Sequence, residues 1–424
     1  MYQGAFSLCG TRKLTNMKKT YQYRAYPTTQ QRSTFVLWLA LLRNLYNQAL
    51  AWRIDAYQKN NDSVKWTTQA NALPDLKAES KAYAGLHVDV LQDAMRRLDK
   101  AYKAFFRRVK NGAAPGFPRF KGEGRYRSMT FSHLSKHLVR NVRRKFAKVV
   151  VPKIGHLKIR YHRPLPDGKI KNLTIIKRAS GWYVTICVEV PDPIEVPVHT
   201  TIGVDVGLNS FAVDSDGEHI PNPRHYRQSE KRLGKHQRVL SRRKKGSRRR
   251  AKQREIVARC HEQIANQRND FQFKAAHRIL ERCDEVAVEN LTITNMLKNH
   301  SLAKSISDAG WGNFRLKLQN KAASAGKQFT KVKPHHTSQQ CSGCREIVPK
   351  QLSDRVHDCP RCGLVLNRDH NAAINIKKAA VALRGGASVA NDPEIPRQGT
   401  EARNSVRPVG RTLQTSTVPS GRGN

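Results

Sequence analysis

Acidic residues and long apolar runs are both scarce in this chain of 424 residues. Asp and Glu number 32 against 78 Lys and Arg, so the formal net charge is +46. A chain this basic needs a polyanionic partner, and we expect nucleic acid. A membrane surface is the alternative, but no run of about 18 apolar residues is present to span a bilayer. The N-terminal residues also lack the apolar segment of a secretory signal peptide, which predicts a cytoplasmic protein.

Cysteine is scarce as well, with eight in the chain. Four of them lie far apart from one another in the sequence, which fits a reducing compartment. The other half forms two CxxC pairs separated by a short loop. These are Cys341, Cys344, Cys359 and Cys362. Two CxxC turns bring four thiolates into a tetrahedral site, which suits one structural Zn²⁺. Disulfides or a redox pair are the alternative, disfavoured because two pairs occur together without a secretory signal.

The length predicts two to four domains, and the pattern changes several times along the chain. Residues 1–16 are expected to be either a poorly ordered arm or the product of an upstream start codon. Alternation of Tyr21, Tyr23 and Ala25 then predicts a strand. From 30 to about 109, apolar residues at steps of three and four predict helices with a buried face. Its members are Trp38, Leu41, Leu42, Leu45, Ala49, Val88, Leu91, Met95, Leu98, Tyr102 and Phe105.

Glycine and proline separate this helical region from a β-rich one. Residues 112–124 are expected to be a hinge, after which short apolar runs at 146–151, 156–161, 171–178 and 181–190 predict strands. Together with the strand near Tyr23 they suggest a small antiparallel barrel or sandwich that the helices interrupt. Prolines at 191–197 form a stiff linker. The Gly-, Pro- and Ser-rich tail from 384 onward is expected to be disordered.

Three acids follow or open regular elements in the second half of the chain. Asp205 ends a buried strand that a hairpin follows, and Glu289 ends another buried strand. Asp369 comes soon after the last cysteine. A carboxylate at the end of an apolar strand is costly unless it is solvated or binds a cation. Each acid alone is more often a turn residue, but together they predict an RNase H-like site for two Mg²⁺ ions that cleaves phosphodiesters.

A run of nine Lys and Arg lies between the first two acids, at residues 241–254. Gly246 predicts a turn between two helices within the run. Like charges at this density repel one another unless they are neutralised, so a nucleic-acid backbone is favoured over solvent. The candidate phosphate contacts are Arg242, Arg243, Lys244, Lys245, Arg248, Arg249 and Arg250. The basic outward residues near Arg97 in the helical region are expected to face phosphates too.

In combination, these motifs resemble the TnpB family of transposon-encoded, RNA-guided DNA nucleases, which are similar to type V CRISPR effectors. The segments that carry the resemblance are GVDVGL, QRVLSRRKKGSRRR, ENL followed by NM, TSQQCSGC and NRDHNAA, with RNLYNQAL and GFPRFKG before them. They occur in order from about Met17 to Ala380. The family usually has Gly at the position of Arg345 and often has His at the position of Phe273.

The resemblance implies a multidomain α+β fold with Asp205, Glu289 and Asp369 as the catalytic triad of a RuvC-type RNase H-like domain. It implies two Mg²⁺ ions, one structural Zn²⁺, a guide RNA, and a double-stranded DNA target read beside a short flanking motif, with single-stranded DNA as a further candidate. The protein would be a monomer or homodimer, nucleoid-associated in a prokaryotic cytoplasm. The implied parts are a β-barrel wedge domain (17–29 and 123–197), a helical recognition domain (30–122), the RuvC-like domain (198–336 and 364–383) and the zinc knuckle (337–363).

Two other functions stay open at this point. A DDE-type transposase also uses three carboxylates on an RNase H-like fold, and it would join DNA strands as well as cut them. A non-cleaving RNA-guided repressor would be expected to have lost an acid, whereas this chain keeps all three. Asn371 is a further candidate, as a hydrogen-bonding residue that orients a phosphate.

Overall fold

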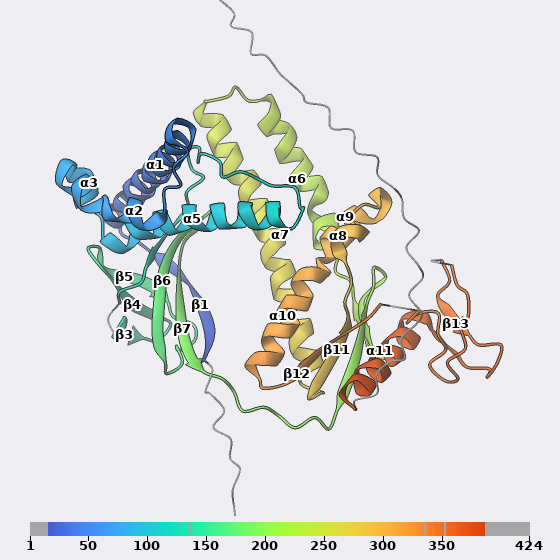
Figure 1. Ribbon diagram of the computed structural model, residues 1–424. Helices are drawn as coiled ribbons and strands as arrows, with labels where there is room; N and C mark the ends of the chain where they lie inside the picture. Colours follow the sequence, from blue (N-terminus) through green and yellow to red (C-terminus); the bar gives the residue numbers. More distant parts are fainter. Residues whose placement is uncertain (1–15, 135–136, 335, 352, 386–424) are drawn as a thin grey trace, which may run out of the picture. The chain divides into compact units, whose positions relative to one another are not determined.

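A computed structural model describes residues 16–134, 137–334, 336–351 and 353–385 (Figure 1). Residues 1–381 form one compact unit, and the second unit, 382–424, is described only up to residue 385. The arm expected at 1–16 and the tail expected from 384 therefore fall almost wholly outside the described residues. None of the described helices combines the length and the apolar character needed to cross a bilayer.

The first sheet has seven antiparallel strands in the order β2-β6-β7-β1-β5-β4-β3. The strands are β1 (Asn16–Tyr26), β2 (Ser128–Phe131), β3 (Val139–Arg143), β4 (Phe146–Val151), β5 (Gly155–Arg160), β6 (Lys169–Arg178) and β7 (Gly181–Pro191). β1 pairs with both β5 and β7, so the N-terminal strand joins the later ones as predicted. The sequence pattern misses β2 and β3 because they are short. No ladder among the described residues joins β2 to β3, so barrel closure stays a prediction.

The helices between β1 and β2 pack their apolar faces into the same core as this sheet. They are α1 (Thr29–Asn60), α2 (Trp66–Asn71), α3 (Leu73–Glu79), α4 (Lys81–Ala84) and α5 (Val88–Lys110). Thr28 caps α1, because its hydroxyl accepts a hydrogen bond from the backbone N–H of Gln31 at 3.2 Å. The predicted apolar stripe is buried or partly buried except at Val88, which is 40% exposed at the start of α5, so its assignment to the core is wrong.

Arg97 on α5 also corrects an expectation. Its guanidinium forms an ion pair with Asp93 at 2.7 Å and donates hydrogen bonds to Ser128 at 3.0 Å and Thr130 at 3.2 Å. These contacts tie α5 to β2. Arg97 therefore holds the helix on the sheet instead of facing phosphates.

The second sheet has five strands in the order β10-β9-β8-β11-β12. They are β8 (Thr201–Val206), β9 (Ser210–Asp214), β10 (His219–Pro221), β11 (Glu285–Glu289) and β12 (Gln328–Val332). β8, β11 and β12 are parallel, and β9 and β10 continue the sheet as an antiparallel hairpin. The predicted hairpin after Asp205 is confirmed, with its second turn at Gly217, where φ is +84°.

Helices join the strands of this second sheet. They are α6 (His225–Arg242), α7 (Arg248–Leu280), α8 (Ile293–Met296), α9 (His300–Ala309), α10 (Trp311–Ser324) and α11 (Arg368–Arg384). α6 and α7 form a long hairpin, seen in yellow-green in Figure 1, that turns at Gly246 as predicted. Ile376 and Ala380 of α11 pack on Ala287 and Val332 of the sheet. The cysteine pairs lie between β12 and α11, with the short hairpin of β13 (Val356–Asp358) and β14 (Val365–Asn367).

Candidate active site and zinc site

Two carboxylates stand at the same edge of the five-stranded sheet. β8 and β11 are parallel, and Val204 lies opposite Val288. The next residue of each strand is an acid, Asp205 on β8 and Glu289 on β11. The valines are buried, whereas both acids are partly exposed. Open α/β sheets bind ligands at the carboxyl ends of their strands, so the pairing presents both acids where a ligand can reach them.

The third acid, Asp369, lies in the first turn of α11. The side chain of Asn367 accepts hydrogen bonds from the backbone N–H of Asp369 at 2.9 Å and of His370 at 3.3 Å, which fixes the start of the helix. A methyl group placed on Gly207 would lie 3.5 Å from Oδ2 of Asp369. Since Gly207 is two residues after Asp205, this distance places the Asp369 carboxylate beside the end of β8.

The three acids repel one another. Burial raises the pKa of the Asp205 carboxyl well above its usual range, and the neighbouring carboxylates of Glu289 and Asp369 raise it further. Burial also raises the pKa of Glu289, while a hydrogen bond from the hydroxyl of Thr337 lowers it. A bound cation would remove this repulsion, and carboxylate oxygens are the ligands that Mg²⁺ prefers.

Carboxylates that converge from different elements are the ligand set that two Mg²⁺ ions held about 4 Å apart require. The catalytic and magnesium-binding roles of the three acids stay predictions.

Gly203, which no sequence pattern marks as important, sets how closely α11 approaches β8. A methyl group on Gly203 would lie 2.2 Å from the carbonyl oxygen of Ala373 and 2.5 Å from the backbone nitrogen of Lys377. Only a residue without a Cβ allows the helix and strand backbones to meet this closely. Gly203 is two residues before Asp205, and Ala373 is four residues after Asp369. The contact therefore brings the two acids together.

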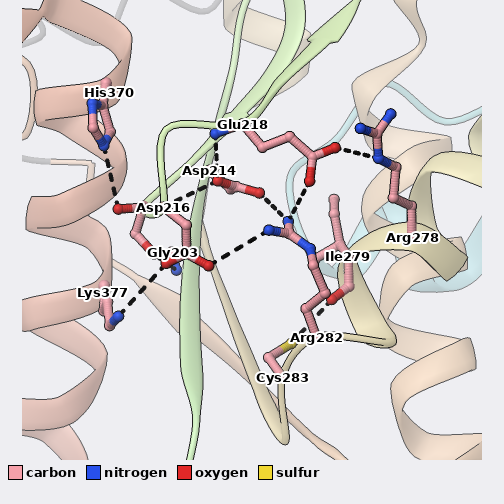
Figure 2. Close-up of polar contacts among 11 residues, drawn as sticks. Gly203, Asp214, Asp216, Glu218, Arg278, Ile279, Arg282, Cys283, His370 and Lys377 are labelled. Atoms are coloured by element: carbon pink, nitrogen blue, oxygen red, sulfur yellow. Dashed lines mark hydrogen bonds and ion pairs between the residues drawn. The ribbon is translucent and has the colours of Figure 1, made fainter.

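Figure 2 shows a second set of contacts, in which the turn after β9 binds α11 on one side and the residues at the end of α7 on the other. Arg282 pairs with Asp214, with Asp216 at 3.5 Å and with Glu218 at 3.0 Å. On the other side, His370 contacts the carbonyl oxygen of Ser215 at 3.3 Å. Asp214 is 2% exposed, so its pairing with Arg282 compensates a buried charge. The turn thus supports the helix at the residue next to Asp369.

The four cysteines meet as predicted. Sγ of Cys341 lies 3.6 Å from Sγ of Cys362, and Sγ of Cys344 lies 3.5 Å from Sγ of Cys359. A disulfide would place the sulfurs at about 2.05 Å, so these pairs are free thiols. Four thiolates about 2.3 Å from a tetrahedral Zn²⁺ are separated by nearly the observed distances, so the residues fit one closed zinc site.

Asparagines of α11 hold the cysteine cluster against the helix. The side chain of Asn371 accepts from the backbone N–H of Ser342 at 2.8 Å and donates to the carbonyl of Gln340 at 2.7 Å. Asn375 donates to the same carbonyl at 2.7 Å. Asn371 is 0% exposed, so the expectation that it orients a phosphate is wrong. Its amide is instead bound on both sides and couples the first cysteine pair to α11.

The residue after each cysteine pair adopts the left-handed conformation. Gly363 has φ +68°, and its N–H donates to the carbonyl of Cys359 at 2.9 Å. Arg345 also has φ +68°, and its N–H donates to the carbonyl of Cys341 at 3.0 Å. The two turns thus share one geometry, and Arg345 occupies a position that favours glycine.

The basic run lies at the turn between α6 and α7. Arg250 donates to the carbonyl oxygens of Leu240 at 2.6 Å and Arg243 at 2.7 Å, and so caps the end of α6. Arg243 donates to the carbonyl of Arg249 at 2.6 Å. These two guanidinium groups stabilise the turn, which leaves the exposed side chains as the stronger candidates for phosphate contacts. The exposed members are Arg242, Lys244, Lys245, Arg248 and Arg249. Their nucleic-acid contacts stay predictions.

Comparison with known proteins gives three family models that together span most of the chain. One described as "Probable transposase" matches residues 185–300, one described as "Cas12f1-like, TNB domain" matches 311–376, and one described as "Helix-turn-helix domain" matches 17–62. The last of these covers β1 and α1 in the structure.

Relatives match over nearly the full length. A Streptomyces pristinaespiralis protein named "Putative RNA-guided DNA endonuclease" is 34% identical over 403 residues, covering 93% of this chain and 96% of the relative. The chain belongs to the TnpB family. An Escherichia coli K12 TnpB relative, "Putative RNA-guided DNA endonuclease InsQ", is 28% identical and covers 90% of this chain and 98% of its own.

The fold is shared with a solved structure as well. The cryo-EM structure of a Cas12f1–sgRNA–target DNA complex matches with a TM-score of 0.51 at 12% identity, covering 85% of this chain and 99% of the Cas12f1 chain. At that identity the likeness concerns the fold alone. The prediction was a multidomain α+β fold, and the likeness supports a mixture of helices and sheets with a four-cysteine cluster. The boundaries of the individual domains stay predictions.

Proposed function

We propose that this TnpB-family protein is a transposon-encoded, RNA-guided DNA endonuclease of the RuvC type. A transposon-derived guide RNA selects the DNA by base pairing, and the protein reads a short flanking duplex motif. Asp205, Glu289 and Asp369 hold two Mg²⁺ ions, and the four-cysteine cluster holds one structural Zn²⁺. The protein acts in a prokaryotic cytoplasm.

One observation carries the proposal. Asp205 and Glu289 end neighbouring parallel strands and the Asp369 carboxylate lies beside the end of β8, so acids from three distant parts of the chain come together, and the pKa of Asp205 is raised accordingly. Arg368 pairs with Asp369 at 3.2 Å and lowers the pKa of Asp205, but burial and the two neighbouring acids outweigh it, so the pKa of Asp205 remains raised. Bound Mg²⁺ would activate a water for attack and neutralise the scissile phosphate. Thr337 orients the Glu289 carboxylate through its hydrogen bond, and Asn367 fixes the turn that presents Asp369.

The test uses protein purified from cells that express the transcript neighbouring the gene. The RNA that copurifies is sequenced, and DNA targets matched or mismatched to its 3′ segment are offered with Mg²⁺ or with EDTA. We expect cleavage of matched targets only, and only with Mg²⁺. Glu289→Ala should abolish cleavage yet keep RNA and DNA binding, because the basic surfaces supply the affinity.

A matched control tests whether the loss of cleavage is specific to the three acids or follows from removing any carboxylate. Glu281 is an exposed acid just after α7, and it pairs with His277 of that helix at 3.2 Å. Glu281→Ala should therefore cut like the wild type. Cleavage that ignores the RNA sequence, or that survives Glu289→Ala, would contradict the proposal.

The transposase alternative is addressed in the same reactions, since one matching family model is described as a transposase. A DDE-type transposase would join the cut ends to a second DNA, whereas the proposed nuclease leaves them free. Joined products that require Asp205, Glu289 and Asp369 would favour transposition. Guide-dependent binding without any cut would favour a repressor.

A further inference from the structure

Four aromatic rings gather where α5 ends and the following loop turns back. Tyr102 and Phe106 are stacked, with centroids 6.3 Å apart and planes at 27°. Phe117, from the loop, meets Tyr102 edge-on at 5.6 Å and Phe105 edge-on at 5.4 Å. Aromatic pairs prefer these geometries, so the loop is packed against the helix by its own side chains.

Polar contacts also fix this loop, which the sequence pattern suggests to be a hinge. Arg108 donates to the carbonyl of Gly116 at 2.8 Å. Further along, Asn47 of α1 accepts from the backbone N–H of Lys121 at 2.7 Å and donates to its carbonyl at 3.1 Å. The loop is therefore anchored on both sides of Phe117 and Phe120, and it presents these residues in a set geometry.

Three of the phenylalanines remain largely open to solvent. Phe106 is 61% exposed, Phe117 is 47% exposed and Phe120 is 57% exposed. Phe106 and Phe117 both belong to the ring cluster, and Phe120 is three residues further along the same anchored loop. Exposed rings gathered on one ordered segment indicate an interaction surface. We call Phe106, Phe117 and Phe120 the aromatic surface.

The charges around the aromatic surface indicate its partner. Residues 105–127 contain seven Lys and Arg and a single acid, Glu123. Among the cations, Arg107, Lys110, Arg119 and Arg125 are exposed. A polyanion that also offers flat faces satisfies both features, and unpaired nucleotides have this chemistry, since bases stack on aromatic rings while cations hold the phosphates. An apolar protein surface would have to desolvate the cations.

We propose that the aromatic surface binds unpaired nucleotides of RNA by stacking. RNA is favoured over DNA because a folded RNA offers splayed bases in its loops and bulges at all times. A DNA duplex offers an unpaired base only after opening, which costs a few kcal/mol. The inference rests on the proposed function only for the presence of an RNA partner. The inference identifies where on the protein that RNA binds and proposes that it binds by stacking.

The test measures binding of the full chain to four probes by fluorescence anisotropy over a range of salt concentrations. The probes are a 20-nucleotide oligouridylate, a 20-base-pair RNA duplex, a 20-nucleotide oligothymidylate and phosphatidylserine vesicles. Phe106→Leu with Phe120→Leu keeps apolar volume but removes two ring faces. We expect oligouridylate affinity to fall by roughly 5- to 100-fold with an unchanged salt slope. Duplex RNA should change by less than about 3-fold, because its bases are already stacked.

Two controls identify stacking as the cause. Phe106→Tyr with Phe120→Tyr should restore single-stranded RNA binding, since the ring faces return. Arg107→Ala with Lys110→Ala should instead flatten the salt slope for single-stranded and duplex RNA alike. An unchanged melting temperature in each variant shows that the fold is kept. If the double Leu variant melts early, Phe106→Leu and Phe120→Leu are measured as single variants, each against its Tyr control.

Several results would overturn the inference. An equal loss for duplex and single-stranded RNA would assign the rings to packing, and a loss confined to oligothymidylate would assign them to DNA. A loss of vesicle binding with unchanged RNA binding would assign them to a membrane surface. Matched-target cleavage by wild type is measured in parallel, so failure of the aromatic surface leaves the proposed function standing, and failure of cleavage leaves the RNA-binding result standing.

Discussion

Replacing Gly203 with alanine tests how the candidate active site is assembled. The added methyl would lie 2.2 Å from the carbonyl oxygen of Ala373, whereas real Cβ atoms essentially never come closer than 3.0 Å. To widen the distance from 2.2 to 3.0 Å, α11 must move away from β8 by about 0.8 Å. No side chain can rotate to relieve the contact, because the opposing atoms belong to the helix backbone.

That movement separates Asp369 on α11 from Asp205 on β8. A misplacement of about 1 Å in a catalytic constellation can cost about 100-fold in rate, so we expect cleavage of a matched target to fall by about that factor. Forcing an extra methyl into a close-packed contact typically costs about 1–3 kcal/mol of unfolding free energy, so the protein should still fold. Single-turnover cleavage and thermal unfolding measure the two effects.

Gly234 supplies the matched control. It lies inside α6, and a methyl group placed there would meet nothing within 4 Å. Gly234→Ala should therefore raise the free energy of unfolding by about 0.5–1 kcal/mol, since alanine favours a helix, and leave cleavage unchanged. A Gly203→Ala protein that melts and cuts like the wild type would refute the view that this backbone contact positions Asp369.

The remaining predictions concern the cysteine turns and the basic run. Arg345→Gly should raise the free energy of unfolding by about 0.5–1 kcal/mol in calorimetry, because glycine adopts the left-handed conformation without strain. Gly363→Ala should lower the free energy of unfolding by about 1 kcal/mol for the converse reason. A less stable Arg345→Gly protein or a more stable Gly363→Ala protein would contradict this account of the two turns. Cys359→Ser should release zinc in metal analysis and lower the melting temperature, and retention of both would exclude a structural zinc. Arg248→Ala with Arg249→Ala should reduce the salt slope of nucleic-acid binding by about 2, and an unchanged slope would remove these residues from the interface.

Local patterns in the sequence were sufficient to predict the strands that carry the candidate acids. A run of apolar residues that ends in Asp205, or in Glu289, indicates that the strand is buried and that its last residue contacts solvent or a ligand. The CxxC spacing likewise predicts the cysteine cluster, because two residues between cysteines fix the geometry of each turn. These signals lie within a few residues of one another in the chain.

Contacts between distant residues were not predictable in the same way. Gly203 reads as an ordinary strand glycine until Ala373 is placed against it. Arg250 reads as one more cation in a basic run, although its guanidinium caps α6. Asn371 reads as a polar neighbour of Asp369 that could face a phosphate, although it is buried against the first cysteine pair. In each case the partner is fixed by the tertiary fold and has no signature near the residue itself.

The position of the cysteine cluster in the chain follows from these contacts. The described residues between β12 and α11 include few buried apolar side chains, chiefly Cys341 and Cys359, so hydrophobic burial in this segment is small. Metal binding can supply the free energy that burial does not, since structural zinc sites are linked to folding. Asn371 and Asn375 transmit it, because both bind the carbonyl of Gln340, the residue before Cys341. α11 is thus held from one side by the cysteine cluster and from the other by Gly203 on β8. Asp369, two residues before Asn371, is positioned between these two supports.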